Sequence, residues 1–320
     1  GGKNSKVFKL EDNENRLYAG KAYFVSSNDN RDRLKAESDS FSFLRANGFE
    51  NVPKVIALDD KKKIAIYQFI KGEKISESVR DADIDDICDF LEFLFKLKNG
   101  RDVEQIQKAS EANFSLRGIF INLDQRLDRI LQVLNSNEDE FVVLTRFIEK
   151  EFIPFQKELY EWIFLRRKKL AVPFDDEIPF EMKTLSPSDL GFHNIILDEK
   201  GTLNFIDFEY FGWDDPTKTI SEFLLHPAMN LSQHHKDLFC KKTLSFFGEK
   251  VRERFELAYY LYGLKWCMII LNEFLPKELD RRKFADSNFL SDLKQKRLLQ
   301  LEKAKAMLEN ITTDWTKNKI

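Results

Sequence analysis

Acidic and amide side chains concentrate in two segments of the chain, SPSDLGFHN and NFIDFEYFGWDDP. The first segment contains Asp189 and, five positions later, Asn194. The second contains Asp207 and, two positions later, Glu209. Hard divalent cations such as Mg²⁺ bind oxygen ligands of these kinds, usually one or two carboxylates together with phosphate oxygens of a substrate. A further carboxylate beside such a metal can orient and deprotonate an attacking hydroxyl, so these residue types fit metal-assisted chemistry on a hydroxyl group.

A predicted β-hairpin brings the two segments together. Residues 194–197 and 203–207 have the composition of strands, and the polar residues 198–201 between them form the turn. We expect a four-residue turn that places Asn194 opposite Phe205, with the end of the second strand diagonally across on the same face. The amide and the carboxylates would then converge just past the ends of the strands.

The convergence predicts a magnesium site with Asn194, Asp207 and Glu209 as its ligands. Asp189, in the loop before the hairpin, would lie beside the metal and act on the acceptor hydroxyl. Each of these residue types is also common in turns, where the side chain bonds its own backbone. Their joint order around one hairpin is what favours the metal site.

Lys21 and Glu37 form a second candidate pair. Glu37 lies on the apolar stripe of a predicted helix, between Leu34 and Phe41, where an unpaired carboxylate would be costly to bury. Lys21 lies among apolar residues of a predicted strand and equally needs a partner. A lysine held by a glutamate between strand and helix can grip the phosphates of a nucleotide.

The first five residues, Gly-Gly-Lys-Asn-Ser, are a candidate turn over phosphate groups. Gly2 lets backbone amides approach phosphate oxygens closely, and Asn4 and Ser5 add hydrogen-bond donors.

The elements that must position these residues fall into two regions. In the first seventy residues, short β-rich runs alternate with polar turns, and one helix interrupts them. Strands are expected at residues 6–10, 17–24, 55–58 and 64–70, and the helix at about 31–47. Beyond Gly72, apolar residues recur near a period of 3.6, which predicts helices at residues 84–97, 119–134, 141–170, 219–225, 251–275 and 290–308. The hairpin is the only strand pair expected in this second region.

Composition narrows the class of protein. Of the 320 residues, 42% are hydrophobic and 33% charged, which is typical of a globular chain. A net charge of −3 with dispersed lysine and arginine argues against a nucleic-acid partner. The most apolar stretch, residues 259–271, is too short to span a bilayer. Cys88, Cys240 and Cys267 are odd in number and far apart, which disfavours a disulfide framework or zinc site and favours a cytoplasmic protein.

Two histidine positions are secondary candidates. His193 is close enough to the predicted site to touch substrate or phosphate, although packing beside Asn194 is an equally good interpretation. His234 and His235 are adjacent, so on a helix their side chains are expected to diverge, which favours solvated histidines over a metal site.

The quoted segments resemble the aminoglycoside phosphotransferase and choline kinase superfamily, relatives of the protein kinases. Asp189 corresponds to the catalytic base of that family, and Asn194 and Asp207 to its metal ligands. The IDFEY segment is similar to that of choline kinases in particular. In the first region, Lys21 corresponds to the phosphate-contacting lysine and Glu37 to its partner on the helix. The resemblance covers most of residues 1–75 and 180–228.

The resemblance implies nucleotide contacts as well. Residues 1–5 correspond to the loop that covers the nucleotide. Gln68, Phe69 and Ile70 correspond to the hinge whose backbone contacts adenine. ATP with Mg²⁺ is the implied phosphoryl donor, and a small-molecule hydroxyl is the implied acceptor.

The implied fold is α+β and two-lobed, like that of the protein kinases. A small β-rich N-lobe with one helix would cover residues 1–70, and a large, mainly helical C-lobe would cover residues 71–320. The sequence departs from the family at Pro187, where the family has a histidine, and at Ser188, where it has glycine or arginine. Because that histidine mainly supports the loop, the departure concerns loop geometry more than chemistry.

Two other functions fit the sequence. A nucleotide-binding pseudokinase, acting as scaffold or sensor, would bind nucleotide and form no phosphorylated product. A metal-dependent phosphohydrolase would use water in place of an alcohol. The acceptor stays open among amino alcohols, sugars and aminoglycosides, because the second region holds both the carboxylates and the aromatic residues that such sites use: Trp213, Asp214, Glu222, Trp266 and Glu273. The oligomeric state is also open.

Overall fold

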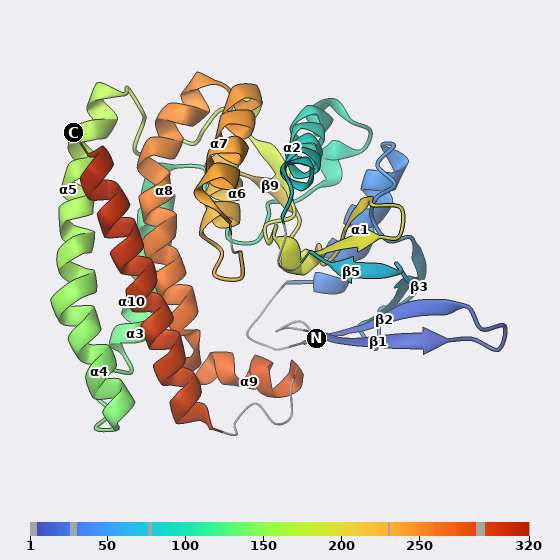
Figure 1. The fold of residues 1–320 in the computed structure, drawn as a ribbon, viewed down its shortest axis with the longest axis horizontal. Helices are drawn as coiled ribbons and strands as arrows, with labels where there is room; N and C mark the ends of the chain where they lie inside the picture. The colour runs from blue at the N-terminus through green and yellow to red at the C-terminus, as the bar shows by residue number, and fades with distance from the viewer. Residues whose placement is uncertain (1–4, 26–30, 76–78, 230, 286–291, 320) are drawn as a thin grey trace. The chain divides into compact units, whose positions relative to one another are not determined.

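The computed structural model describes residues 5–25, 31–75, 79–229, 231–285 and 292–319 (Figure 1). The chain forms two compact units, each built from two separate stretches: residues 1–112 with 183–247, and residues 113–182 with 248–320. The predicted α+β class is confirmed. The lobe boundary near residue 70 stays a prediction.

The first unit begins with a four-stranded antiparallel sheet in the order β1-β2-β4-β3. Its strands are β1 (Ser5–Glu11), β2 (Leu17–Tyr23), β3 (Val55–Asp59) and β4 (Ile64–Gln68). All four lie within a few residues of the expected positions. The helix α1 (Arg33–Ala46) packs against β3 and β4, where it buries Leu34, Phe41 and Leu44 (Figure 1).

The predicted hairpin is present with a register that differs from the expected one. Ile195, not Asn194, is opposite Phe205, in strands β7 (Ile195–Asp198) and β8 (Leu203–Phe205). The reason is the turn. The Asp198 carboxylate accepts hydrogen bonds from the backbone N–H groups of residues 200 and 202, which closes a three-residue loop. Gly201 completes this loop with φ +81°, in the left-handed region that glycine tolerates.

The hairpin is not the only strand pairing after Gly72, which corrects the sequence-based expectation. Strand β5 (Gly72–Lys74) pairs with β7, so that the hairpin belongs to a three-stranded sheet. A Cβ atom at position 72 would lie 2.2 Å from the carbonyl oxygen of Leu197, so this pairing requires glycine. A separate antiparallel pair joins β6 (Thr184–Ser186) to β9 (Gly212–Asp214).

Three further α-helices lie in the described part of the first unit. The helix α6 (Pro216–Leu225) is buried along its whole length and begins three residues before the expected range 219–225. Its start has residue types that favour a helix beginning, with Asp215 as N-cap and Pro216 in the first turn. The helices α2 (Asp81–Lys96) and α7 (Gln233–Phe247) pack against each other. Helix α7 was not expected from the sequence.

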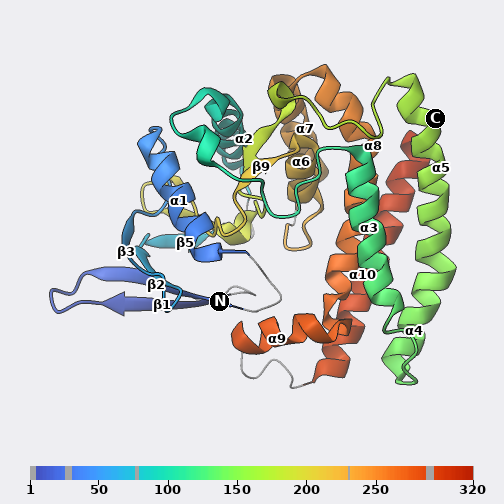
Figure 2. The ribbon, with the colours of Figure 1, turned by 180° about the vertical axis from the view of Figure 1, so that it is seen from behind.

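The second unit is helical (Figure 2). Its central helix is α8 (Glu249–Ile270), which packs against α3 (Leu116–Leu131), α5 (Ile153–Lys169) and α10 (Leu293–Asn318). The expected helix at residues 141–170 is interrupted: a π-helical turn at 148–152 separates α4 (Asp139–Phe147) from α5. Pro154 explains the interruption, because its ring nitrogen cannot donate a helical hydrogen bond. The short helix α9 (Pro276–Ala285) was not expected.

None of the helices in the described part of the chain combines the length and the apolar character that a membrane span requires.

Candidate active site

The candidate site lies in the first unit and is centred on Lys21 in β2. The Lys21 ammonium is 2.6 Å from the Glu37 carboxylate on α1 and 2.6 Å from the Asp207 carboxylate. A third carboxylate, Glu209, lies 3.7 Å away. The predicted pairing of Lys21 with Glu37 is therefore present in the structure. The ammonium also joins this pair to the segment that the sequence singled out for metal binding.

The carboxylate of Glu37 is held from a second direction. The Tyr23 hydroxyl donates to it at 2.6 Å and is also within 2.6 Å of the Tyr67 hydroxyl. Tyr23 lies two positions after Lys21 in β2, on the same face of the sheet. Strand β2 thus supplies both partners of the Glu37 carboxylate.

Burial and the charges of neighbouring carboxylates shift the pKa values in this cluster. Burial alone would lower the pKa of Lys21, but the carboxylates of Glu37, Asp207 and Glu209 outweigh burial and raise its pKa well above the usual value. Burial, reinforced by the charge of Asp207 and opposed by Lys21, raises the pKa of Glu37 to about 7. Burial also raises the pKa of Glu209. Three carboxylates thus surround Lys21, with Arg33 3.8 Å from Glu209 as a second cation.

Asp207 and Glu209 are placed by the residue between them. Phe208 is buried, with its ring centroid 5.3 Å from that of Phe41 on α1 and 5.7 Å from that of Phe211. Asp207 itself has φ +66°, so the chain leaves the strand direction at this residue. The buried ring and the local turn together direct the two flanking carboxylates towards Lys21.

The loop before the hairpin positions Asp189 and Asn194. The Asn194 side-chain nitrogen donates to the Asp189 backbone carbonyl at 2.9 Å, which orients the amide and reserves its oxygen for a donor or a cation. The backbone carbonyl of Asn194 accepts from the N–H of Ile206 at 2.9 Å. This bond ties the loop to the residue that precedes Asp207, as the hairpin hypothesis required despite its shifted register.

Two histidines border the Asp189 carboxylate. His193 Nε2 lies 3.2 Å from Asp189 Oδ1, and His226 Nε2 lies 3.9 Å from the same oxygen. The two imidazoles stack with centroids 4.3 Å apart. His193 therefore contacts the predicted base, a contact that neither interpretation of the sequence named. His226, which follows α6, was missed because nothing in its sequence neighbourhood marks it.

A buried lysine beneath the loop was also missed. Lys218 on α6 lies 2.6 Å from the Asp214 carboxylate and donates to the Ser188 hydroxyl at 2.6 Å and to the Ser110 carbonyl at 3.0 Å. Ser188 has φ +63°, so its backbone is in the sparsely populated left-handed region. The Lys218 ammonium thus holds the residue directly before Asp189.

The serine on the other side of Pro187 is anchored by the same helix. Thr219 Oγ1 donates to Ser186 Oγ at 2.9 Å, and Ser186 Oγ accepts from the Ser188 N–H at 3.0 Å. Contacts from α6 therefore support the loop on both sides of the position where the resembling family has a histidine.

Comparison with known proteins identifies the architecture. No protein-family model and no curated protein sequence matches the chain. Among solved structures, the choline kinase LicA from Streptococcus pneumoniae superposes with a TM-score of 0.57 at 14% identity, covering 97% of this chain and 92% of that one. A spectinomycin phosphotransferase, solved with ADP and spectinomycin, gives a TM-score of 0.61 at 12% identity, with 97% and 90% covered. An ethanolamine kinase from Plasmodium vivax gives 0.58 at 14% identity, with 94% and 80% covered.

The chain has the fold of these small-molecule kinases. The kinase-like, two-lobed α+β architecture implied by the resemblance is confirmed at the level of the fold.

Within this kinase-like fold, the other predicted nucleotide contacts have different outcomes. Gly2 and Asn4 lie outside the described residues. Ser5 is buried at the start of β1, opposite Tyr23. Gln68 ends β4 and is exposed, and Phe69 and Ile70, which follow it, are half-buried. This segment connects β4 to β5, as a hinge would.

Three carboxylates considered for acceptor binding have structural partners. Asp214 is fully buried against Lys218, and burial raises its pKa to about 6. Glu222 lies 3.9 Å from the same ammonium. Trp266 and Glu273 belong to the second unit, where Glu273 lies 3.1 Å from Arg282.

Proposed function

We propose that this chain is a kinase that transfers the γ-phosphoryl group of ATP, with Mg²⁺, to a hydroxyl group of a small molecule. The observation that carries the proposal is the meeting of Lys21 with both Glu37 and Asp207. A lysine held by a helix glutamate next to a metal-binding aspartate is the arrangement used to bind nucleotide phosphates in kinases.

The residues present fit a magnesium ion. Glu37, Asp207 and Glu209 each offer a carboxylate oxygen, and these oxygens lie within 4.8 Å of one another. Asp207 is the most exposed of the three side chains at 26%, against 3% for Glu37 and 4% for Glu209. We assign Asp207 and Asn194 as ligands, with Glu209 as an auxiliary ligand. Bound magnesium would neutralise charge on the transferred phosphoryl group.

The chain's own groups have distinct roles in this proposal. The Lys21 ammonium would bind the α- and β-phosphates, and Glu37 would hold it in place. The Asp189 carboxylate would orient the acceptor hydroxyl and take its proton. Gly2, Asn4 and Ser5 would cover the phosphates, and the backbone of Gln68, Phe69 and Ile70 would contact adenine.

The acceptor is proposed as a small polar alcohol. The neighbours act on choline, ethanolamine and spectinomycin, as their names state. Because Lys218 engages both Asp214 and Glu222 in the first unit, neither carboxylate supports a cationic acceptor by itself. A neutral sugar or polyol therefore belongs in the test beside the amino alcohols and aminoglycosides.

An ATP-consumption screen across amino alcohols, sugars, nucleosides and aminoglycosides tests the proposal. We expect at least one acceptor to stimulate magnesium-dependent ADP formation and to yield a phosphorylated product by mass spectrometry. The Asp189→Asn variant is the matched control and should lose this stimulation. Nucleotide binding without product from any acceptor would contradict the proposal and support a pseudokinase, whereas product from water alone would support a phosphohydrolase.

A further inference from the structure

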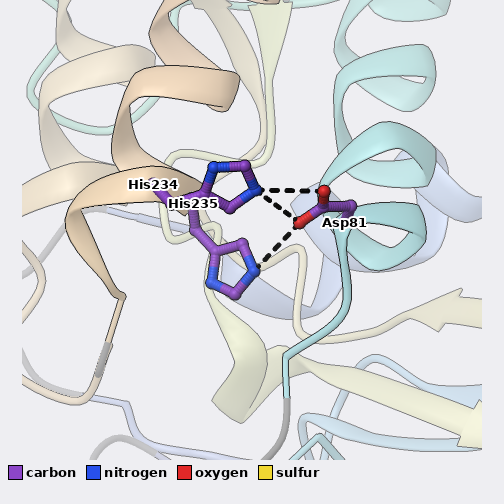
Figure 3. Close-up of side chains that lie close together, drawn as sticks. All are labelled: Asp81, His234 and His235. Carbon is purple, nitrogen blue, oxygen red and sulfur yellow. Dashed lines mark hydrogen bonds and ion pairs between the residues drawn. The ribbon is translucent and has the colours of Figure 1, made fainter.

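A cluster of side chains that could bind a metal ion lies outside the candidate active site, between the first turns of two packed helices. His234 and His235, in the first turn of α7, direct their rings towards Asp81, the first residue of α2 (Figure 3). His234 Nε2 is 2.9 Å and 3.0 Å from the two Asp81 carboxylate oxygens. His235 Nε2 is 3.3 Å from Asp81 Oδ1. The expectation that adjacent histidines diverge is therefore wrong here.

The physical reason for the convergence is that the carboxylate lies on a neighbouring helix. Two successive side chains leave α7 in different directions, but each imidazole is long enough to turn back towards one point beyond the helix surface (Figure 3). The interplanar angle of the rings is 55° and their centroids are 5.4 Å apart. Both rings thus present the same atom, Nε2, to Asp81.

We propose that Asp81, His234 and His235 form a binding site for a divalent transition metal, with Zn²⁺ as the best fit. Zinc bonds to imidazole nitrogen at about 2.0 to 2.1 Å, so neighbouring ligand atoms of a tetrahedral site are about 3.3 Å apart. The nitrogen-to-oxygen separations of 2.9 to 3.3 Å are close to that edge length. Imidazole ligands favour zinc over magnesium or calcium. Solvent would supply the remaining ligand, because the Asp81 and His234 side chains are 59% and 66% exposed.

The surroundings favour a cation. The first turns of α2 are rich in aspartate, at positions 81, 83, 85, 86 and 89, which makes the local potential negative. The neighbouring Arg80 is held 2.6 Å from Asp83.

Such a site would clamp α7 onto α2 without using any residue of the proposed kinase site. It is independent of the proposed function, since it requires neither nucleotide nor acceptor.

The histidine content of the chain permits a clean experiment. There are four histidines, and the other two, His193 and His226, belong to the cluster at Asp189. We would titrate Zn²⁺ into the metal-free full-length protein and follow the imidazole nitrogens by NMR. Binding of one equivalent should perturb the signals of His234 and His235 and leave those of His193 and His226 unchanged.

Matched double variants assign the site by calorimetry and cobalt absorption spectra. His234→Gln with His235→Gln should abolish the binding. Asp81→Asn should weaken it by at least about 10-fold, because even the replacement of a residue that only supports a metal ligand typically costs that much affinity. His193→Gln with His226→Gln should change affinity by less than about 2-fold. Circular dichroism checks that each variant folds.

The proposal fails if the His234 and His235 signals do not respond to Zn²⁺ at micromolar concentration. It also fails if the paired substitution at these positions leaves zinc affinity intact. Perturbation of His193 and His226 instead would move the site to Asp189 and equally overturn the assignment.

Discussion

A single ammonium group organises the candidate active site. Lys21 meets carboxylates from α1 and from the segment after β8, so one side chain connects a strand, a helix and the proposed metal ligands. Because a buried charge is stable only with partners, the same property that made Lys21 and Glu37 conspicuous in the sequence explains their contact in the fold.

The first prediction concerns Asp189. Its replacement by asparagine keeps the side-chain size but removes the carboxylate that we propose as the acceptor of the proton. Turnover with the true acceptor should fall by roughly 100-fold or more, while nucleotide affinity changes little. Steady-state kinetics under saturating ATP and calorimetric nucleotide titration measure the two quantities. Unchanged turnover would remove Asp189 from the chemistry.

The second prediction concerns the pH dependence of Glu37. Its pKa rises from an ordinary value of 4.5 to about 7 in the folded protein, so the folded state binds this proton more tightly than the unfolded state. The associated stabilisation is complete below pH 4.5 and is lost as the pH rises to about 7. Relative to Glu37→Gln, the wild-type free energy of unfolding should therefore decline across this window. Urea denaturation of both proteins at several pH values measures it, and parallel pH profiles would contradict the assignment.

At the scale of elements, helix α6 supports the loop that carries Asp189. Lys218 and Thr219, two adjacent residues of this buried helix, bond Ser188 and Ser186, which flank Pro187. Proline fixes its own φ but has neither a backbone N–H nor a polar side chain to bond to α6. The loop conformation therefore depends on Ser186, on Ser188 and on the helix that bonds them. In this chain, contacts from α6 therefore hold the loop on both sides of Pro187.

The third prediction tests Lys218 as a positioning residue. Lys218→Met leaves the buried Asp214 carboxylate without its ammonium, which should cost about 3 to 5 kcal/mol of stability. Turnover should fall while the KM for ATP stays nearly constant, because the nucleotide contacts are elsewhere. The double variant Lys218→Met with Asp214→Asn should recover much of the stability, yet not the turnover, since Ser188 still lacks its donor. Full recovery of turnover in the double variant would show that Lys218 acts only on stability.

At the scale of the whole molecule, all the described residues assigned to nucleotide, metal and acceptor proton lie in the first compact unit. That unit is assembled from residues 1–112 and 183–247, and the helical stretch between them belongs to the second unit. Binding of magnesium and nucleotide should therefore stabilise one unit directly.

The fourth prediction follows from this division. Magnesium with a non-hydrolysable ATP analogue should slow amide hydrogen exchange in β1, β2, β4 and the loop at residues 186–194. Local exchange in α3, α5, α8 and α10 should change much less. Exchange measured by mass spectrometry provides the test, with Asp207→Ala as the control that should lose the magnesium-dependent part. Equal protection of both units in the wild type, or full protection in the control, would contradict the placement of the site.

Local sequence patterns predicted the main elements of the first region and one ion pair of the site. The run of β-rich segments, the helix at α1 and the start of α6 were predictable, because alternation, apolar periodicity and capping are local properties. The pairing of Lys21 with Glu37 was predictable as well, because the cost of burying either charge alone is a property of the residue and its immediate pattern.

Only the tertiary structure decided what depends on distant partners. Strands β5, β6 and β9 have three residues each, too few to show a pattern, and exist because other strands pair with them. The hairpin register shifted by one residue because the Asp198 carboxylate bonds two backbone amides and shortens the loop. Lys218 reaches Ser110 across 108 positions, and His234 reaches Asp81 across 153. Such contacts follow from how helices and loops meet in space, which no local pattern of the chain encodes.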